Sequence, residues 1–209
     1  LNVLNAAQGA GARKIIMASS GGCIYGEPKT LPVKETYRGT PDSPYGISKK
    51  VLHDYLAFYR KAHGIDFTVL ALANVYGPRQ DPTGEAGVIA IFASKMLAGE
   101  APTIFGDGDQ TRDYVFVDDT VHAFSLAGER GDGRLVNVGT GLETSVNGLY
   151  QMLAGSTGFT GQPAQGPPRP GDLRRSALDP ELASSVLGWK PWTHLEDGLG
   201  ETVAFLKGI

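Results

Sequence analysis

The sequence has few of the features that mark secreted, membrane-spanning or metal-binding proteins. Its single cysteine, Cys23, excludes an internal disulfide and is compatible with a reducing cytosol, so we expect a cytoplasmic protein. No apolar run reaches the roughly 18 residues of a membrane span, and the first residues carry no secretory pattern, so no membrane partner is expected. Four histidines without ligand spacing predict no metal site. The net charge of -3 gives no electrostatic reason to expect a nucleic-acid partner.

A glycine-rich phosphate-binding loop is also missing. None of the 29 glycines forms a Gly-x-Gly-x-x-Gly or Gly-x-x-Gly-x-x-Gly motif at a strand–helix turn. The chain begins without methionine, in a helical pattern that leads directly into an apolar strand. We therefore expect a fragment, or a chain whose first part is absent.

The residues that are present predict an α/β protein with one core, or one domain with a small appendage. Apolar runs at 14–18 and 67–73 are typical of buried parallel strands, and a helix expected between them indicates a doubly wound sheet. Another strand is expected at 135–139. Further helices are expected at 2–10, 88–97, from 118 onward, 180–187 and 195–206, and loops at 27–44, 81–87 and 155–172.

A helix that carries Tyr45 and Lys49 is expected to begin near residue 44. Asp42 or Ser43 can cap it, and Pro44 suits its first position. Residues four apart lie on the same helix face, and an ammonium one turn away favours the ionised form of a phenol whose ordinary pKa is about 10. The pair could therefore transfer a proton beside an alcohol or carbonyl. Taken alone, the spacing is weak evidence, because it occurs by chance in many helices.

Small polar residues follow the two expected strands. Ser19, Ser20 and two glycines come after the first strand, and Asn74 follows the second. The carboxyl ends of parallel strands line the crevice in which α/β proteins bind ligands. A Ser/Gly-rich turn without a ligand is the alternative at this point.

Five motifs follow one another along the chain. They are Ser19-Ser20-Gly-Gly-x-Ile-Tyr25-Gly26, Tyr45-x-x-x-Lys49, Asn74-Val-Tyr-Gly-Pro-Arg-Gln, Phe105-Gly-Asp-Gly-x-Gln-Thr-Arg112-Asp-Tyr and Arg169-Pro-Gly-Asp172. Together they resemble the extended short-chain dehydrogenase/reductases, a group of NAD-dependent epimerases and dehydratases, and within it the UDP-glucose (galactose) 4-epimerases most.

The resemblance implies the C-terminal part of a Rossmann-like doubly wound parallel sheet with a small mixed α/β substrate-binding domain. It assigns residues 1–78 to the NAD-binding part, to which the chain returns around residues 113–139. Residues 79–112 and 140–209 are assigned to the nucleotide-sugar-binding domain, which interleaves with it. The first part of the family's NAD-binding fold, roughly a hundred residues with the glycine-rich loop, is missing.

The resemblance also implies catalytic roles. Tyr45 is the base that removes a proton from the sugar 4-hydroxyl, and Lys49 assists it and binds the nicotinamide ribose of NAD, beside Ser19 and Ser20. Hydride passes from sugar C4 to NAD and returns to the other face of a rotated 4-keto sugar. Many family members place a Ser or Thr at the position of Gly21. Ser20 is the candidate for this third catalytic role, and an ordered water is the alternative.

A second set of residues is implied for the UDP-sugar substrate. Asn74, Arg112 and Arg169 are expected near the phosphates and Asp172 at the ribose, because arginines suit bidentate contacts with phosphate. Thr103 and Phe105 are expected at the uracil. Ser176 stands where some 4-epimerases have a bulky Tyr, which predicts room for an N-acetyl group.

Other interpretations remain open. The chain could be another nucleotide-sugar enzyme of this fold (a decarboxylase, a reductase or a different epimerase), or a binding protein without catalysis. Dehydratases of the resembled family carry Thr-Asp-Glu before the Val-Tyr-Gly, and these acids protonate the leaving hydroxyl. This chain has Gly21-Gly22-Cys23 instead, so dehydration is disfavoured. A homodimer is expected by resemblance, with contacts from Leu52, Leu56 and Tyr59. The remaining candidates are interpreted as structural: Asp118 and Asp119 as a helix cap, Trp189 and Trp192 as packing residues, and Cys23 as a buried small residue.

Overall fold

The computed structural model describes residues 1–83 and 87–208, so the loop predicted over 81–87 lies partly outside the described residues. A parallel sheet forms one half of the molecule, with strands β1 (Lys14–Ser20), β2 (Asp66–Leu72) and β7 (Arg134–Val138) in the order β1-β2-β7. Its register places Ala18 opposite Leu70 and Leu70 opposite Val136. The strands are apolar on both faces because helices cover both faces.

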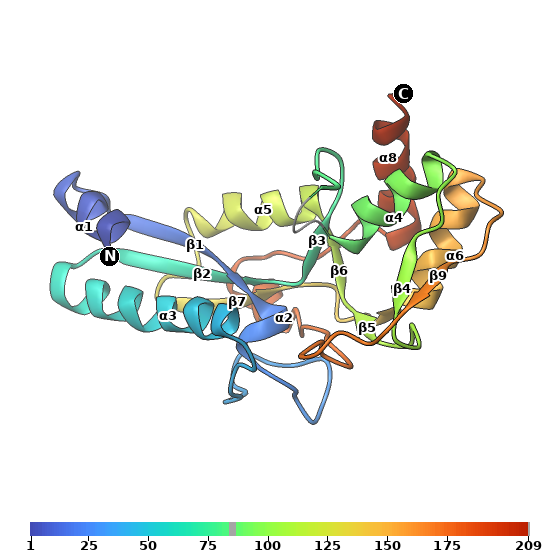
Figure 1. The fold of residues 1–209 in the computed structure, drawn as a ribbon. Helices are drawn as coiled ribbons and strands as arrows, with labels where there is room; N and C mark the ends of the chain where they lie inside the picture. The colour runs from blue at the N-terminus through green and yellow to red at the C-terminus, as the bar shows by residue number, and fades with distance from the viewer. Residues whose placement is uncertain (84–86, 209) are drawn as a thin grey trace.

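Helices lie on opposite sides of this sheet (Figure 1). On one side, α1 (Asn2–Gly9) and α3 (Pro44–His63) pack on Phe67 and Val69. On the other side, α5 (Val117–Ala127) and α7 (Glu181–Val186) pack on Leu70 and Val136. Neighbouring strand residues point to opposite faces, which is why Val69 and Leu70 belong to different cores. The doubly wound α/β arrangement predicted from the sequence is confirmed.

The start of α3 is the one that its sequence predicts. Of the two candidate caps, the Ser43 hydroxyl accepts a hydrogen bond from the Gly46 amide at 3.1 Å, and Pro44 is the first helical residue. Gly64 ends the helix in the left-handed conformation, with φ of 70°.

The expected dimer contacts on α3 need correction. Leu56 and Tyr59 are buried against the sheet of their own chain, at 1% and 5% exposure, so they are not available for a partner. The exposed apolar side chains in the middle of the helix are Val51, Tyr55 and Phe58, while Tyr45 and Ile47 are exposed on its first turn. The helix is apolar on more than one face, and the sequence pattern did not distinguish the face that meets the sheet.

A second half of the molecule surrounds another core. There β3 (Asn74–Tyr76) pairs in parallel with β6 (Tyr114–Phe116), and three helices pack around Tyr76, Phe116 and Leu149. These helices are α4 (Val88–Leu97), α6 (Val146–Thr157) and α8 (Leu195–Lys207), which lie together at the far end from α1 (Figure 1). Two short ladders complete it: β4 (Thr103–Phe105) with β9 (Ala164–Gly166), and β5 (Thr111–Arg112) with β8 (Thr144–Ser145).

Several elements of this second half were not predicted, among them α6 and β9. The helix α6 has a clear signal, because Val146, Leu149, Tyr150 and Leu153 follow helical spacing and all are buried. Residues 155–172 were expected to be a loop, but they contain the end of α6 and strand β9. The β9 residues Ala-Gln-Gly carry no apolar pattern, and only their pairing with β4 makes them a strand.

Asp118 and Asp119 lie in the first turn of α5 as predicted, where carboxylates favour a helix N-terminus, but neither caps the helix. Helix α5 begins at Val117 without a side-chain cap, and the buried Asp119 carboxylate accepts hydrogen bonds from Thr193 at 3.1 and 3.2 Å. Trp189 is fully buried as predicted, and its indole donates to the Asp119 carbonyl oxygen at 2.7 Å. Trp192, by contrast, is 55% exposed, so it is not a core residue. The segment with α7 and Trp189 packs on the parallel sheet, while the domain boundaries remain a prediction.

Residues 1–83 and 87–208 show neither a membrane-spanning helix nor a metal-binding cluster. None of their helices has the length and apolar character needed to cross a membrane. They also contain no group of three or more His, Cys, Asp or Glu side chains arranged to hold a metal ion.

Candidate active site

The predicted catalytic pair lies on the first turns of α3. The Lys49 ammonium nitrogen lies 5.6 Å from the centroid of the Tyr45 ring, so the two side chains share one helix face. Tyr45 is 56% exposed, which leaves its ring accessible. The pair is placed there because α3 begins directly after the 27–43 loop, which returns the chain to the carboxyl end of β1.

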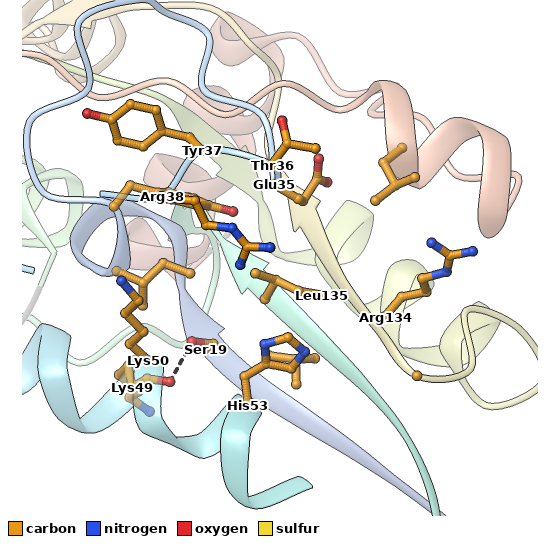
Figure 2. A pocket seen from close by; sticks show the side chains of 15 residues that line it. Ser19, Glu35, Thr36, Tyr37, Arg38, Lys49, Lys50, His53, Arg134 and Leu135 are labelled. Carbon is orange, nitrogen blue, oxygen red and sulfur yellow. Dashed lines mark hydrogen bonds between the residues drawn. The ribbon is translucent and has the colours of Figure 1, made fainter. Parts of the chain in front are cut away.

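The two serines at the end of β1 face different spaces. Ser19 is buried, and its hydroxyl donates to the Lys49 carbonyl oxygen at 3.3 Å. Figure 2 shows this bond at the edge of a cavity of about 340 Å³, which His53 and Leu135 also line. Ser20 instead lines a separate pocket of about 250 Å³ together with Gly22 and Asn74. Ser19 therefore supports the backbone of α3, and Ser20 is the serine that faces the pocket.

Gly21, where many members of the resembled family carry a hydroxyl, has no room for one in this structure. It is the first residue of the short helix α2 (Gly21–Ile24) and is buried. A Cβ atom at this position would lie 2.8 Å from Cδ2 of Leu178 and closer still to Cδ1, well inside van der Waals contact. Gly22 is more open, since its added Cβ would lie 3.8 Å from both Asn74 Oδ1 and Ser176 Oγ.

Six of the seven predicted substrate residues line one pocket of about 440 Å³. They are Asn74, Thr103, Phe105, Arg112, Arg169 and Asp172. The seventh, Ser176, is buried at 8% exposure and lies behind Gly22 rather than in the wall of this pocket. Asn74, Arg112 and Asp172 also line the smaller pocket with Ser20, so the two pockets share a wall.

The two predicted arginines are held differently. Nη1 of Arg112 donates to the carbonyl oxygens of Thr111 and Leu173, each at 2.7 Å, and its other nitrogen pairs with Asp172. This fixes the Arg112 guanidinium at the shared wall. Arg169 lies with its guanidinium 3.9 Å from the Phe105 ring centroid, a cation–π contact, and remains exposed.

Sequence reasoning missed several residues that line the larger pocket, among them Gln110 and Tyr114. The Gln110 side chain donates to the Phe105 carbonyl oxygen at 2.9 Å and so fixes the β4 end of the pocket. Tyr114 is 6% exposed, and its buried hydroxyl has no hydrogen-bond partner among residues 1–83 and 87–208. Burial raises the pKa of Tyr114 to about 12, so the hydroxyl stays protonated as a donor. Tyr114 begins β6 two residues after Arg112, and the alternation of side chains along extended backbone could have placed both on the pocket side.

Asp113 lies directly behind these residues and was also missed. Its carboxylate is 1% exposed and accepts hydrogen bonds from Thr140, Gly141 and Leu178. Its backbone carbonyl oxygen accepts from the Asn74 amide at 2.9 Å. Burial raises the pKa of Asp113, and the hydrogen bonds oppose that shift. The residue thus connects the site wall to two loops.

Cys23, predicted to be a buried small residue, is partly buried beside the Ser20 pocket. Burial raises the pKa of its thiol, while the hydrogen bond to the Ser20 carbonyl oxygen and the charge of Lys49 act in the opposite direction. The thiol is therefore less ionised than that of a free cysteine at the same pH.

Known proteins resemble this chain over nearly its whole length. A model of the NAD dependent epimerase/dehydratase family matches residues 1–139. A UDP-glucose 4-epimerase of Mycolicibacterium smegmatis is 50% identical over 99% of this chain and 66% of its own length. A putative UDP-glucose 4-epimerase of Methanocaldococcus jannaschii is 46% identical over 99% of this chain and 67% of its length.

Solved structures agree with these relatives. The crystal structure of UDP-glucose 4-epimerase from Thermotoga maritima with UDP-glucose has a TM-score of 0.96 and 47% identity, covering 99% of this chain and 67% of that one. The Thermus thermophilus UDP-glucose 4-epimerase complex with NAD has a TM-score of 0.91 and 40% identity, covering 99% and 68%. The chain therefore spans about two thirds of the length of the proteins that it matches.

Proposed function

The chain belongs to the NAD dependent epimerase/dehydratase family, and from that premise we propose that it takes part in NAD-dependent epimerisation of a UDP-hexose at C4. The observation that carries the proposal is the meeting of six predicted nucleotide-sugar residues in one pocket, which shares a wall with the Ser20 pocket. The relatives named UDP-glucose 4-epimerase, at 46–50% identity, support UDP-glucose and UDP-galactose as the first substrates to test.

The residues at the carboxyl end of β1 fit the nicotinamide end of NAD. Tyr45 is exposed, and the Lys49 ammonium lies over its ring with no ion pair in the part of the chain that the structure describes. Lys49 would hold the nicotinamide ribose, with Ser20 nearby, while no residue of this chain is assigned to the pyrophosphate. When bound, NAD supplies a hydride acceptor and donor.

The chain's own residues would move the proton and orient the sugar. Tyr45 takes the proton of the sugar 4-hydroxyl through its phenolic oxygen and returns it after the sugar has turned. Lys49, one helical turn away, stabilises the phenolate by its charge. Ser20 donates or accepts at the same hydroxyl, because it is the serine that faces the pocket.

The larger pocket would hold the UDP part. Its volume of about 440 Å³ lies within the range of ligand pockets. Arg112 and Arg169 would contact the diphosphate with Asn74, because a guanidinium matches phosphate oxygens in geometry and charge. Asp172 would accept from the ribose. The backbone at 103–105 would meet the uracil, and the Tyr114 hydroxyl supplies one more donor.

We also propose that the sugar subsite accepts an N-acetyl group. The proposal rests on the small side chain of Ser176, which is buried beside Gly22 where some 4-epimerases carry a bulky Tyr. A UDP-N-acetylglucosamine 4-epimerase of Methanobrevibacter ruminantium has a TM-score of 0.93 and 32% identity to this chain. Turnover of UDP-N-acetylgalactosamine beside UDP-galactose is the expected result, and an undetectable rate on the acetylated sugar contradicts it.

A homodimer and a cytoplasmic location remain proposals. Val51, Tyr55 and Phe58 lie exposed along α3 and line a shallow pocket with Leu1, which is the surface that a second copy would cover. Sedimentation of the NAD-bound protein should therefore show a dimer. A monomer at assay concentration contradicts this part of the proposal.

The function is tested with a panel of UDP-, dTDP- and GDP-sugars incubated with the NAD-bound protein. We expect conversion of UDP-hexoses to their C4 epimers, with little change in the dTDP and GDP series. Loss of carbon dioxide, net reduction of the sugar, or binding without conversion would each contradict epimerisation.

A further inference from the structure

Leu178 occupies the space beside Gly21 and is fixed there from two sides. Its backbone amide donates to Oδ2 of Asp113 at 3.1 Å. Its neighbours pair with the loop before α3, since the Val33 amide donates to the Ala177 carbonyl oxygen at 2.8 Å and the Asp179 amide to that of Val33 at 2.9 Å. Leu178 is fully buried, so the surrounding residues restrict the conformation of its side chain.

Asp113 is itself tightly held. Oδ1 accepts from the Thr140 hydroxyl at 2.6 Å and from the Thr140 amide at 2.9 Å, and Oδ2 accepts from the Gly141 amide at 3.0 Å. A Cβ atom at Gly139 would lie 2.6 Å from Oδ2 and 3.0 Å from the Leu178 Cβ. The close approach of these segments therefore requires glycine at 139.

The turn at residues 20–22 rests on this unit. Ser20 has extended backbone angles and precedes the first residue of α2, and Gly21 lies against the two methyl groups of Leu178. A carboxylate buried with several donors is costly to displace, and a packed leucine deforms little. The position of Leu178 thus limits where the Ser20–Gly22 backbone can lie.

We infer that Leu178, held by Asp113, is a positioning residue that sets the 20–22 turn and so presents Ser20 to the sugar; this inference rests on the proposed function. Leu178 and Gly21 form a complementary pair, in which the leucine fills the place that a hydroxyl side chain at position 21 would need. The third catalytic role then passes to Ser20, one residue earlier.

The test is a double-mutant cycle on the NAD-bound protein with UDP-glucose. Leu178→Ala should lower kcat by about 10- to 100-fold, the range expected when a catalytic group is displaced. Its KM should stay within about twofold, because the UDP contacts are unchanged. Gly21→Ser should lower kcat similarly, since its hydroxymethyl group meets Leu178. The double variant should recover at least about tenfold over Gly21→Ser, because the new serine then has room.

A second measurement does not depend on turnover. Hydrogen–deuterium exchange of the peptide covering residues 20–24 should be faster in Leu178→Ala than in the native protein, because α2 loses its support. Leu187→Ala is the matched control. Leu187 is equally buried but packs on the other face of the sheet, so its truncation should lower stability without changing kcat or this exchange. Leu178→Val serves if the alanine variant does not fold.

The outcomes separate the two proposals. Failure of the native NAD-bound protein to convert any UDP-hexose refutes the proposed function, and the exchange experiment then still tests the packing. Native turnover with strictly additive effects of Gly21→Ser and Leu178→Ala overturns the inference. Unchanged exchange at residues 20–24 in Leu178→Ala overturns it as well.

Discussion

The buried hydroxyl of Tyr114 provides a prediction in which stability and binding move in opposite directions. The side chain is 6% exposed, lines the larger pocket, and has no hydrogen-bond partner among the described residues. A buried hydroxyl without a partner costs about 1–3 kcal/mol of desolvation. Tyr114→Phe removes only that oxygen, so the ligand-free protein should be equally stable or up to about 2 kcal/mol more stable.

Binding of UDP should weaken in the same variant. A hydrogen bond to a charged phosphate oxygen contributes about 1.5–3 kcal/mol, and one to a neutral group about 1 kcal/mol, so Kd should rise by roughly tenfold. Urea denaturation without ligand and calorimetric titration with UDP measure the two effects. Tyr150→Phe is the control: its hydroxyl donates to the Gly161 carbonyl oxygen at 2.7 Å, so its loss should destabilise the protein by about 1 kcal/mol without changing UDP affinity.

The reasoning is refuted if Tyr114→Phe destabilises the ligand-free protein as much as Tyr150→Phe does while leaving UDP affinity unchanged. That result would mean that the hydroxyl is satisfied inside the folded chain and takes no part in the pocket.

The remaining predictions concern three other side chains. Arg169→Ala should raise the Kd for UDP by about 10- to 100-fold, because a charge-assisted contact is lost. Thermal stability should stay unchanged, because the side chain is exposed, and an unchanged Kd in calorimetry would contradict the prediction. Cys23 should react with iodoacetamide more slowly than a free cysteine at pH 8, because burial raises the pKa of its thiol, and an equal rate would contradict the structure. Arg175 lowers the pKa of Glu143 below its ordinary 4.5, so this pair should stabilise the folded protein above that pH and lose that effect as the pH falls. Urea titrations of Glu143→Gln should therefore differ from the native protein at pH 7 and converge with it near pH 3, and a constant difference would be inconsistent with the pair.

Local signals in the sequence were sufficient for the helix that carries Tyr45 and Lys49 and for the strand ends. Ser43 and Pro44 act through backbone geometry within a few residues, so the start of α3 followed from them. The apolar runs before Ser20 and Asn74 likewise identified strands covered on both faces. The expectation that residues between 74 and 172 form one substrate pocket came from the resemblance to a family, because no local sequence pattern joins them.

Long-range contacts explain what the sequence did not predict. Asp113 and Leu178 are 65 residues apart, and only the folded chain brings them together behind Gly21. The sequence did not show which face of α3 packs inward. The buried Leu56 and Tyr59 and the exposed Val51, Tyr55 and Phe58 are all apolar, so they look alike in the sequence. Which face meets a sheet depends on the sheet, and not on the helix alone. Asp119 was expected to cap α5, and its actual partner was missed because Thr193 is 74 residues away in the chain.

We propose that Tyr45 and Lys49 act beside a pocket for a UDP-sugar and invert its C4. The most direct measurement follows UDP-glucose by proton NMR with the NAD-bound protein and with its Tyr45→Phe variant. The account predicts a growing fraction of UDP-galactose with the native protein. It also predicts a rate at least about 100-fold lower in the variant, the contribution of a positioned general base. UDP-glucose that remains unchanged beside bound NAD, or an equal rate in the variant, would contradict it.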